Sequence, residues 1–209
     1  MDVRSLPPRI LIEMAQRRQR PGTGSQRTFL KRRTARMTFP DLTPILESIP
    51  WATVGAVATR LYMPERTTQD LDLAIRATDA SRVRQRLTAA GFTYQGELSI
   101  GGSSWLTPEG FMVDVLECPE PWFDQAVAEA AHNRDLQGLP VLPLPYLVLL
   151  KFQAGRVQDL ADITRMLGQA EEAALSSVRA VFERWLPEAR EDLESLIALG
   201  RLEMQEDAR

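Results

Sequence analysis

Residues 54–73 read VGAVATRLYMPERTTQDLDL, and this stretch decides the fold that we expect. It ends in Asp70-Leu71-Asp72-Leu73, where carboxylates alternate with apolar side chains. Successive side chains of a β-strand point to opposite faces, so the two aspartates would share one face and the two leucines would enter a core. Adjacent carboxylates repel each other unless a cation lies between them, and Mg²⁺ prefers oxygen ligands. The stretch therefore predicts a strand that carries half of a Mg²⁺ site.

Upstream of this strand, Val54-Gly55-Ala56 opens a segment with the pattern of a short helix, residues 56–62. A glycine at the N-terminus of a helix lets a phosphate approach the backbone N–H groups and the positive end of the helix dipole. We therefore expect Gly55 and Ala56 to form a phosphate-binding turn in the same stretch as the two aspartates.

A third carboxylate lies in residues 111–116, which alternate in polarity as a strand does. Val113 and Val115 would lie on one face of this strand and Asp114 on the other. A charge inside an otherwise apolar strand is costly unless it is paired or bound to a metal. Asp114 is therefore a candidate ligand, although an aspartate that simply faces solvent would show the same pattern.

A second polar cluster lies in residues 146–167, which predict one long helix. Lys151, Gly155, Asp159 and Asp162 would fall within about 80° of one another on such a helix, opposite an apolar stripe. A lysine is unexpected in so apolar a helix start, and its ammonium could meet a phosphate. A charged face in contact with water is the alternative.

The composition narrows the chemistry further. The 209 residues are 44% hydrophobic and 25% charged, as in ordinary globular proteins. One cysteine, Cys118, and one histidine, His132, exclude an intrachain disulfide and a Cys- or His-rich metal site. No apolar run is long enough to span a membrane, and we expect a cytoplasmic protein. Any chemistry must therefore depend on carboxylates.

The charge is distributed unevenly along the chain. Residues 1–37 hold ten Lys and Arg against two acidic residues, whereas the net charge of the whole chain is −3. We expect 1–37 to be a basic, disordered arm, which could be a simple tail or could bind nucleic acid. Residues 38–143 would form the core domain and residues 144–209 a C-terminal helical region.

The first motif resembles a known family. An apolar-Gly-Ala turn, thirteen residues and then Asp-apolar-Asp-apolar are similar to the signature of the DNA polymerase β-type nucleotidyltransferase superfamily. Ala56 stands where the family has Gly or Ser, so a backbone N–H remains but a hydroxyl contact is absent. The resemblance implies that Asp70 and Asp72 bind the metal at the β- and γ-phosphates. It implies that Asp114 completes the site at the metal that activates the acceptor.

The second polar cluster resembles the motifs of one branch of this superfamily. Lys151, Arg156, Asp159 and Asp162, together with the approach RTTQD at residues 66–70, resemble motifs of abortive-infection (AbiEii-like) toxin nucleotidyltransferases. The similarity spans roughly residues 50–168. It implies that Thr68 and Lys151 contact nucleotide phosphates, and that Asp159 assists catalysis or orients the lysine.

Together these features predict an α+β nucleotidyltransferase fold, a small mixed sheet flanked by helices and followed by the helical region. The resemblance implies Mg²⁺, with Mn²⁺ as an alternative, and transfer of a nucleoside monophosphate from an NTP to a hydroxyl. The acceptor would be RNA such as tRNA, or a protein, and a toxin would have a cognate antitoxin as partner. A small-molecule acceptor of the aminoglycoside type remains open, as does a non-catalytic partner module of the same fold.

Overall fold

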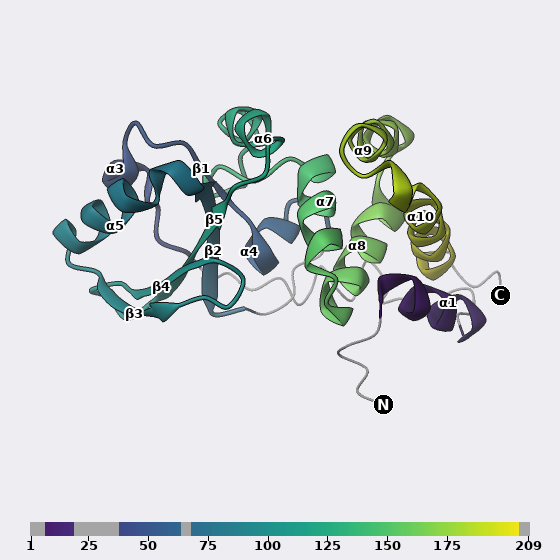
Figure 1. Ribbon diagram of the computed structural model, residues 1–209, viewed down its shortest axis with the longest axis horizontal. Helices are drawn as coiled ribbons and strands as arrows, with labels where there is room; N and C mark the ends of the chain where they lie inside the picture. Colours follow the sequence, from purple (N-terminus) through teal and green to yellow (C-terminus); the bar gives the residue numbers. More distant parts are fainter. Residues whose placement is uncertain (1–6, 19–37, 64–67, 205–209) are drawn as a thin grey trace. The chain divides into compact units, whose positions relative to one another are not determined.

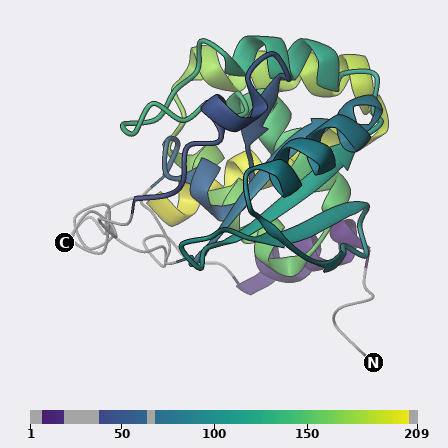
Figure 2. The same cartoon turned by 90° about the vertical axis from the view of Figure 1, so that its left-hand side faces the viewer.

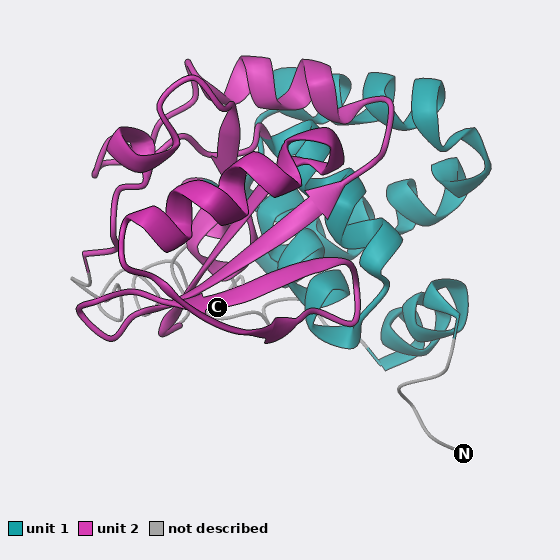
Figure 3. Ribbon diagram, turned by 60° about the vertical axis from the view of Figure 1, so that its left-hand side comes forward, with its two compact units in different colours: residues 1–33, 62–64, 144–209 teal, residues 34–61, 65–143 magenta. Residues whose placement is uncertain are grey.

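The computed structural model describes residues 7–18, 38–63 and 68–204. The chain divides into two compact units, which are coloured separately in Figure 3. The sheet unit comprises the described parts of 34–61 and 65–143, and the helical unit those of 1–33, 62–64 and 144–209.

The sheet unit is built on five strands in the order β1-β2-β5-β4-β3. The central pair, β2 and β5, is parallel, and the other pairs are antiparallel. The strands are β1 Trp51–Thr53, β2 Asp70–Arg76, β3 Thr93–Glu97, β4 Gly102–Leu106 and β5 Met112–Cys118. The helices are α3 Thr43–Leu46, α4 Gly55–Thr59, α5 Ala80–Ala89 and α6 Phe123–Ala130, with a 3-10 turn at Ala77–Asp79. The expected mixed α+β fold is confirmed.

One face of the sheet forms the hydrophobic core of this unit. Leu71 and Leu73 of β2 are fully buried, and Val113 of β5 lies beside them on the same face. This face packs against Leu46 of α3 and Leu87 of α5, and Figures 1 and 2 show these two helices together over the sheet. Because alternate residues of each strand enter this core, the intervening residues must face the other way.

The helical unit contains α1 Pro8–Arg18, α7 Leu144–Ala154, α8 Val157–Gln169, α9 Glu172–Trp185 and α10 Arg190–Met204, with a 3-10 turn at Pro187–Ala189. Helices α8 and α10 approach each other closely where Gly168 meets Gly200. A Cβ built on Gly168 would lie 2.3 Å from the Gly200 carbonyl oxygen. Glycine on both helices therefore allows backbone to pack directly on backbone. No helix in the described part of the chain is long and apolar enough to cross a membrane.

Two predictions about this unit need correction. The single helix expected over residues 146–167 is two helices, because Gly155 adopts φ +64° and ends α7 before α8 begins at Val157. The disorder expected over 1–37 is wrong for Pro8–Arg18, because these residues form α1, which contacts α8 and α10 within the helical unit and in which Ile12 is buried. The rest of the expected arm, 1–6 and 19–37, lies outside the described residues.

Candidate functional site

Asp70, Asp72 and Asp114 lie on the sheet face opposite the core. The parallel register pairs Asp72 of β2 with Asp114 of β5, and Asp70 lies two residues before Asp72 on the same face. Neighbouring strands are about 4.8 Å apart, so carboxylates on adjacent strands can reach one ion. The sheet therefore aligns the three aspartates that the sequence singled out.

The three carboxylates are at least partly accessible. Asp70 is exposed, and Asp72 and Asp114 are half-buried. Their neighbours along the strands are buried and apolar: Leu71 and Leu73 in β2, and Val113 and Val115 in β5. Within the described residues, neither Asp70 nor Asp114 has an ion pair or a side-chain hydrogen bond. Oxygen-only donors on adjacent strands fit the preference of Mg²⁺. Across the described chain, no three His, Cys, Asp or Glu side chains converge as a metal cage would require, so the metal site stays a prediction.

Gly55 connects the predicted phosphate-binding turn to these aspartates. Its φ is +61°, and an added Cβ would lie 1.8 Å from Oδ2 of Asp72, so only glycine fits there. The backbone N–H of Val54 donates to the Asp72 carbonyl at 2.9 Å. The start of α4 is thus fixed directly beside the Asp72 carboxylate, as the spacing of the motif suggested.

Ala56 and Thr68, which are also predicted to bind phosphate, belong to the same unit as Gly55. Ala56 is buried in the first turn of α4, with 4% of its surface exposed, and its carbonyl accepts a hydrogen bond from the Thr59 hydroxyl at 2.7 Å. Thr68 precedes β2, and its hydroxyl donates to the carbonyl oxygen of Asp70 at 3.4 Å. Their contact with a nucleotide remains a prediction.

An ion pair that the sequence did not reveal fixes the far end of α4. Arg60 Nε donates to Oδ2 of Asp135 at 3.1 Å, and its guanidinium also bonds Gln137 and lies over the Phe39 ring. The Asp135 carboxylate is 97% buried and accepts two further bonds, from the backbone N–H groups of Gln137 and Leu139. Since 75 residues separate Arg60 from Asp135, only the tertiary structure brings the pair together.

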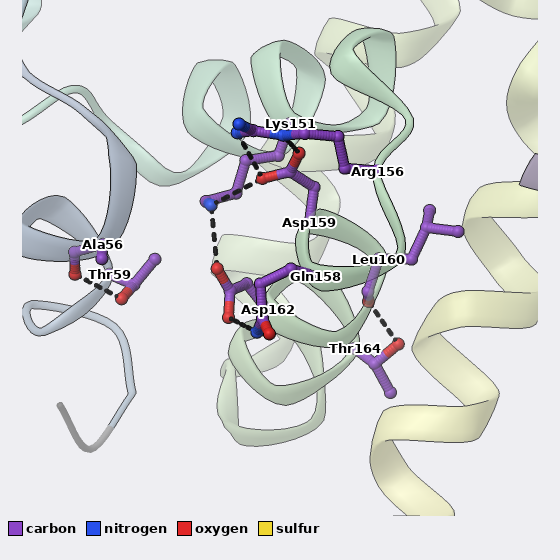
Figure 4. A network of polar contacts seen from close by, with 9 residues as sticks. All are labelled: Ala56, Thr59, Lys151, Arg156, Gln158, Asp159, Leu160, Asp162 and Thr164. Atoms are coloured by element: carbon purple, nitrogen blue, oxygen red, sulfur yellow. Dashed lines mark hydrogen bonds and ion pairs between the residues drawn. The ribbon is translucent and has the colours of Figure 1, made fainter. Parts of the chain in front are cut away.

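The second predicted cluster lies in the helical unit. Figure 4 shows the Lys151 ammonium between the carboxylates of Asp159 and Asp162, at Nζ–O distances of 3.1 and 2.9 Å. All three side chains are at least 95% buried. Arg156 Nε also donates to Asp159, at 2.6 Å, and Gln158 donates to Asp162, at 3.1 Å. The sequence placed these charges on one helix, whereas α7 supplies the lysine and α8 both aspartates.

This arrangement changes what Lys151 is expected to do. Two carboxylates already bind its ammonium in a dry environment, which satisfies the charges of a buried group. Asp159 contacts the lysine, as the resemblance allowed. Contact between Lys151 and nucleotide phosphates stays a prediction, and it must compete with two ion pairs.

The thiol does not add a nucleophile to the site. Cys118 ends β5 and is buried. Burial, together with the negative charge of Glu120, raises the pKa of its thiol to about 12. A thiol that stays protonated at neutral pH is a poor nucleophile.

A hydroxyl that the sequence did not single out lies beside Asp114. The antiparallel register of β4 and β5 pairs Ser104 with Asp114, so the two side chains share a face. Strand alternation alone does not say which residue of another strand Ser104 meets, so the sequence could not reveal this pair.

Comparisons with known proteins give structural neighbours only. No protein-family model and no curated protein matches the chain. The solution structure of the antibiotic-resistance factor ANT(2'')-Ia aligns at a TM-score of 0.42 with 16% identity, over 77% of this chain and 87% of that one. The crystal structure of ANT(2'')-Ia in complex with adenylyl-2''-tobramycin gives 0.41 and 17%, over 77% and 93%.

A further solved structure, of a Thermotoga maritima protein (TM1012) described as a nucleotidyltransferase, gives a TM-score of 0.39 with 15% identity, over 62% of this chain and 91% of that one. The structural neighbours are thus nucleotidyltransferases. At these scores the likeness carries no argument about activity, which must come from the site.

Proposed function

We propose that this chain is a Mg²⁺-dependent nucleotidyltransferase that moves a nucleoside monophosphate from an NTP to a hydroxyl acceptor. The observation that supports this most is the register of β2 and β5. It pairs Asp72 with Asp114 on the face opposite the core, with Gly55 against the Asp72 carboxylate. Carboxylates and a phosphate-binding turn in one place are the parts that phosphoryl transfer requires.

In this proposal the three carboxylates have different roles. Asp70 and Asp72 hold the triphosphate side, and the backbone N–H groups after Gly55 face a phosphate. Asp114 lies on the acceptor side and takes the proton of the attacking hydroxyl. Mg²⁺ bound by these carboxylates, or Mn²⁺ in its place, supplies positive charge that offsets the charge of the phosphates.

The bond changes follow from these positions. The acceptor oxygen forms a bond to the α-phosphorus, the bond from that phosphorus to the bridging oxygen of the β-phosphate breaks, and pyrophosphate leaves. The hydroxyl proton passes to Asp114. Little covalent chemistry falls to the protein, so holding the groups in line accounts for most of the catalysis.

The acceptor is proposed from the sequence resemblance. It favours a macromolecule, RNA such as tRNA or a protein, in a toxin that a cognate antitoxin restrains. A small molecule such as an aminoglycoside is the alternative acceptor. The roles of Thr68, Lys151 and Asp159 in binding phosphates and assisting catalysis are proposed on the same basis.

A second candidate is a non-catalytic module that uses this fold to bind a partner. Ala56 favours it, because the buried methyl group offers a phosphate no hydroxyl at a position where the family has Gly or Ser. Under this alternative the aspartates would be retained only as surface charges, and the protein would bind no nucleotide.

Calorimetric titration with Mg²⁺ and each of the four NTPs separates the two candidates. We expect the parent to bind at least one NTP, and the Asp72→Asn variant, whose neutral amide is a poorer Mg²⁺ ligand, to bind it at least tenfold more weakly. Asp124→Asn is the matched control, because Asp124 is a well-exposed aspartate of α6 in the same unit. Absence of NTP binding in the parent, or equal binding by the parent and Asp72→Asn, would contradict the proposal.

A further inference from the structure

A row of polar residues crosses three strands on the face opposite the core. Asp72 of β2 pairs with Asp114 of β5, and Asp114 pairs in turn with Ser104 of β4. Directly opposite residues of antiparallel strands have their Cβ atoms about 4.5–5.5 Å apart. A serine hydroxyl at that distance can reach the carboxylate of its cross-strand partner.

Two adjacent serines of β4, Ser103 and Ser104, differ in burial and in their hydrogen bonds. Ser103 faces the core, is 1% exposed, and its hydroxyl accepts a hydrogen bond from Trp105 Nε1 at 2.9 Å. Ser104 is half-buried on the other face, and within the described residues its hydroxyl has no hydrogen-bond partner. The Ser103 hydroxyl thus has its hydrogen-bond partner in the core, whereas the Ser104 hydroxyl is available to donate to another group.

Space is left around Ser104. Its partner on β3 is Gly96, and a Cβ built on Gly96 would meet nothing within 4 Å. No side chain of its direct partner on β3 therefore crowds the Ser104 hydroxyl. A hydroxyl rotates about a single bond to suit its acceptor.

Asp114 needs such a donor if it holds a metal. A carboxylate that ligates a metal through one oxygen is normally fixed by a hydrogen bond to the other, which orients it. Met112 and Leu116, the next residues of β5 on this face, have apolar side chains and cannot donate. The register gives Asp114 two cross-strand partners, Asp72 and Ser104, and the serine hydroxyl is the group that can donate to a carboxylate.

We infer that Ser104 is a positioning residue of the metal site: its hydroxyl donates to one oxygen of Asp114 and orients the other toward the cation. This inference rests on the proposed function, because it needs Asp114 to be a metal ligand. It goes beyond that function by extending the site onto a third strand.

The test is titration of the folded protein with Mn²⁺ alone, with bound Mn²⁺ measured by electron paramagnetic resonance. Outer hydrogen bonds to ligands are worth roughly 10–100-fold in metal affinity, so Ser104→Ala should weaken Mn²⁺ binding by about tenfold or more. Ser104→Thr keeps the hydroxyl and suits a strand, so it should bind Mn²⁺ as the parent does.

Ser103→Ala is the matched control, one residue away on the opposite face. It should lower the melting temperature, because it leaves the buried Trp105 N–H without its acceptor, but it should leave Mn²⁺ affinity within about twofold of the parent. Ser104→Ala should show the reverse pattern, with a melting temperature close to that of the parent.

The outcomes are distinguishable. If the parent binds Mn²⁺ and Ser104→Ala binds it equally well, the inference is wrong and the proposed function is untouched. The inference also fails if Ser103→Ala loses as much affinity as Ser104→Ala, since the effect would then be general. Absence of Mn²⁺ binding in the parent would overturn the proposed metal site itself, and this inference with it.

Discussion

Replacement of Lys151 by methionine tests whether the buried cluster of the helical unit is structural. Lys151 is 96% buried, and its ammonium bonds Asp159 and Asp162, which are almost fully buried themselves. Methionine keeps most of the apolar stem and removes the charge, so the change isolates the ion pairs from the packing. It leaves two carboxylates in the interior without the lysine.

The structure sets the size of the effect. Removal of one partner from a buried ion pair costs about 3–5 kcal/mol. Asp159 would keep its bond from Arg156 and Asp162 its bond from Gln158, so the lower end applies and we expect a loss of about 3 kcal/mol. For a chain of this size that is a fall in the melting temperature of roughly 6–12 °C.

Thermal melts followed by circular dichroism measure this loss. Arg84→Met is the matched control, because Arg84 also bridges two carboxylates, Glu97 and Glu117, but at the surface. Exposed pairs contribute little, so this variant should melt within about 2 °C of the parent. Adding Asp162→Asn to Lys151→Met should restore part of the loss, because one uncompensated charge disappears.

The reasoning would be refuted if Lys151→Met melted as Arg84→Met does. If it also bound Mg²⁺–NTP more weakly, the lysine would have the phosphate contact that the sequence resemblance implies. A large loss of stability with unchanged NTP affinity at temperatures where the variant is folded would assign Lys151 to the core of the helical unit.

Three further predictions concern other parts of the chain. Ile12→Ala should lower the melting temperature by roughly 5 °C, because Ile12 of α1 is only 3% exposed. Ile10→Ala, at a position that is 40% exposed, should change the melting temperature by about 1 °C or less. Equal shifts in the two variants would show that α1 is not docked. Gly168→Ala should also lower the melting temperature, because the clash with the Gly200 backbone outweighs the gain in helix propensity of about 1 kcal/mol. The control in the same melts is Ser177→Ala, at an exposed position. An unchanged or higher melting temperature for Gly168→Ala would contradict the close approach of the two helices. Burial raises the pKa of Cys118 to about 12, so a maleimide at pH 8 should label it quickly only in denaturant; rapid labelling of the native protein would show that the thiol is accessible.

The sequence predicted most of the sheet unit because its signals are local. The alternation around Asp70-Leu71-Asp72 and around Asp114 identified β2 and β5 and the face each aspartate takes. What it could not provide was register. Pairing of Asp114 with Ser104, or of Arg60 with Asp135, joins residues far apart in the chain, and no periodicity carries that information.

The helical unit was predicted less well, for two physical reasons. The apolar period continues through Gly155, and a glycine inside a helical pattern is usually tolerated, so the break at φ +64° left no clear signal. Helix α1 buries little more than Ile12, and a short apolar run flanked by arginines looks like a tail. The grouping of Lys151 with Asp159 and Asp162 was nevertheless anticipated, although the residues come from two helices.

The measurement that tests the central proposal most directly is transfer of label from α-³²P-labelled NTPs in the presence of Mg²⁺. The candidate acceptors are tRNA, total cellular protein and an aminoglycoside. We expect label on one acceptor class with release of one pyrophosphate per transfer, near-complete loss of transfer in Asp72→Asn and Asp114→Asn, and full transfer in Asp124→Asn. Label transfer that survives in Asp72→Asn and Asp114→Asn, or no transfer by the parent from any NTP to any of these acceptors, would contradict a nucleotidyltransferase built on these aspartates.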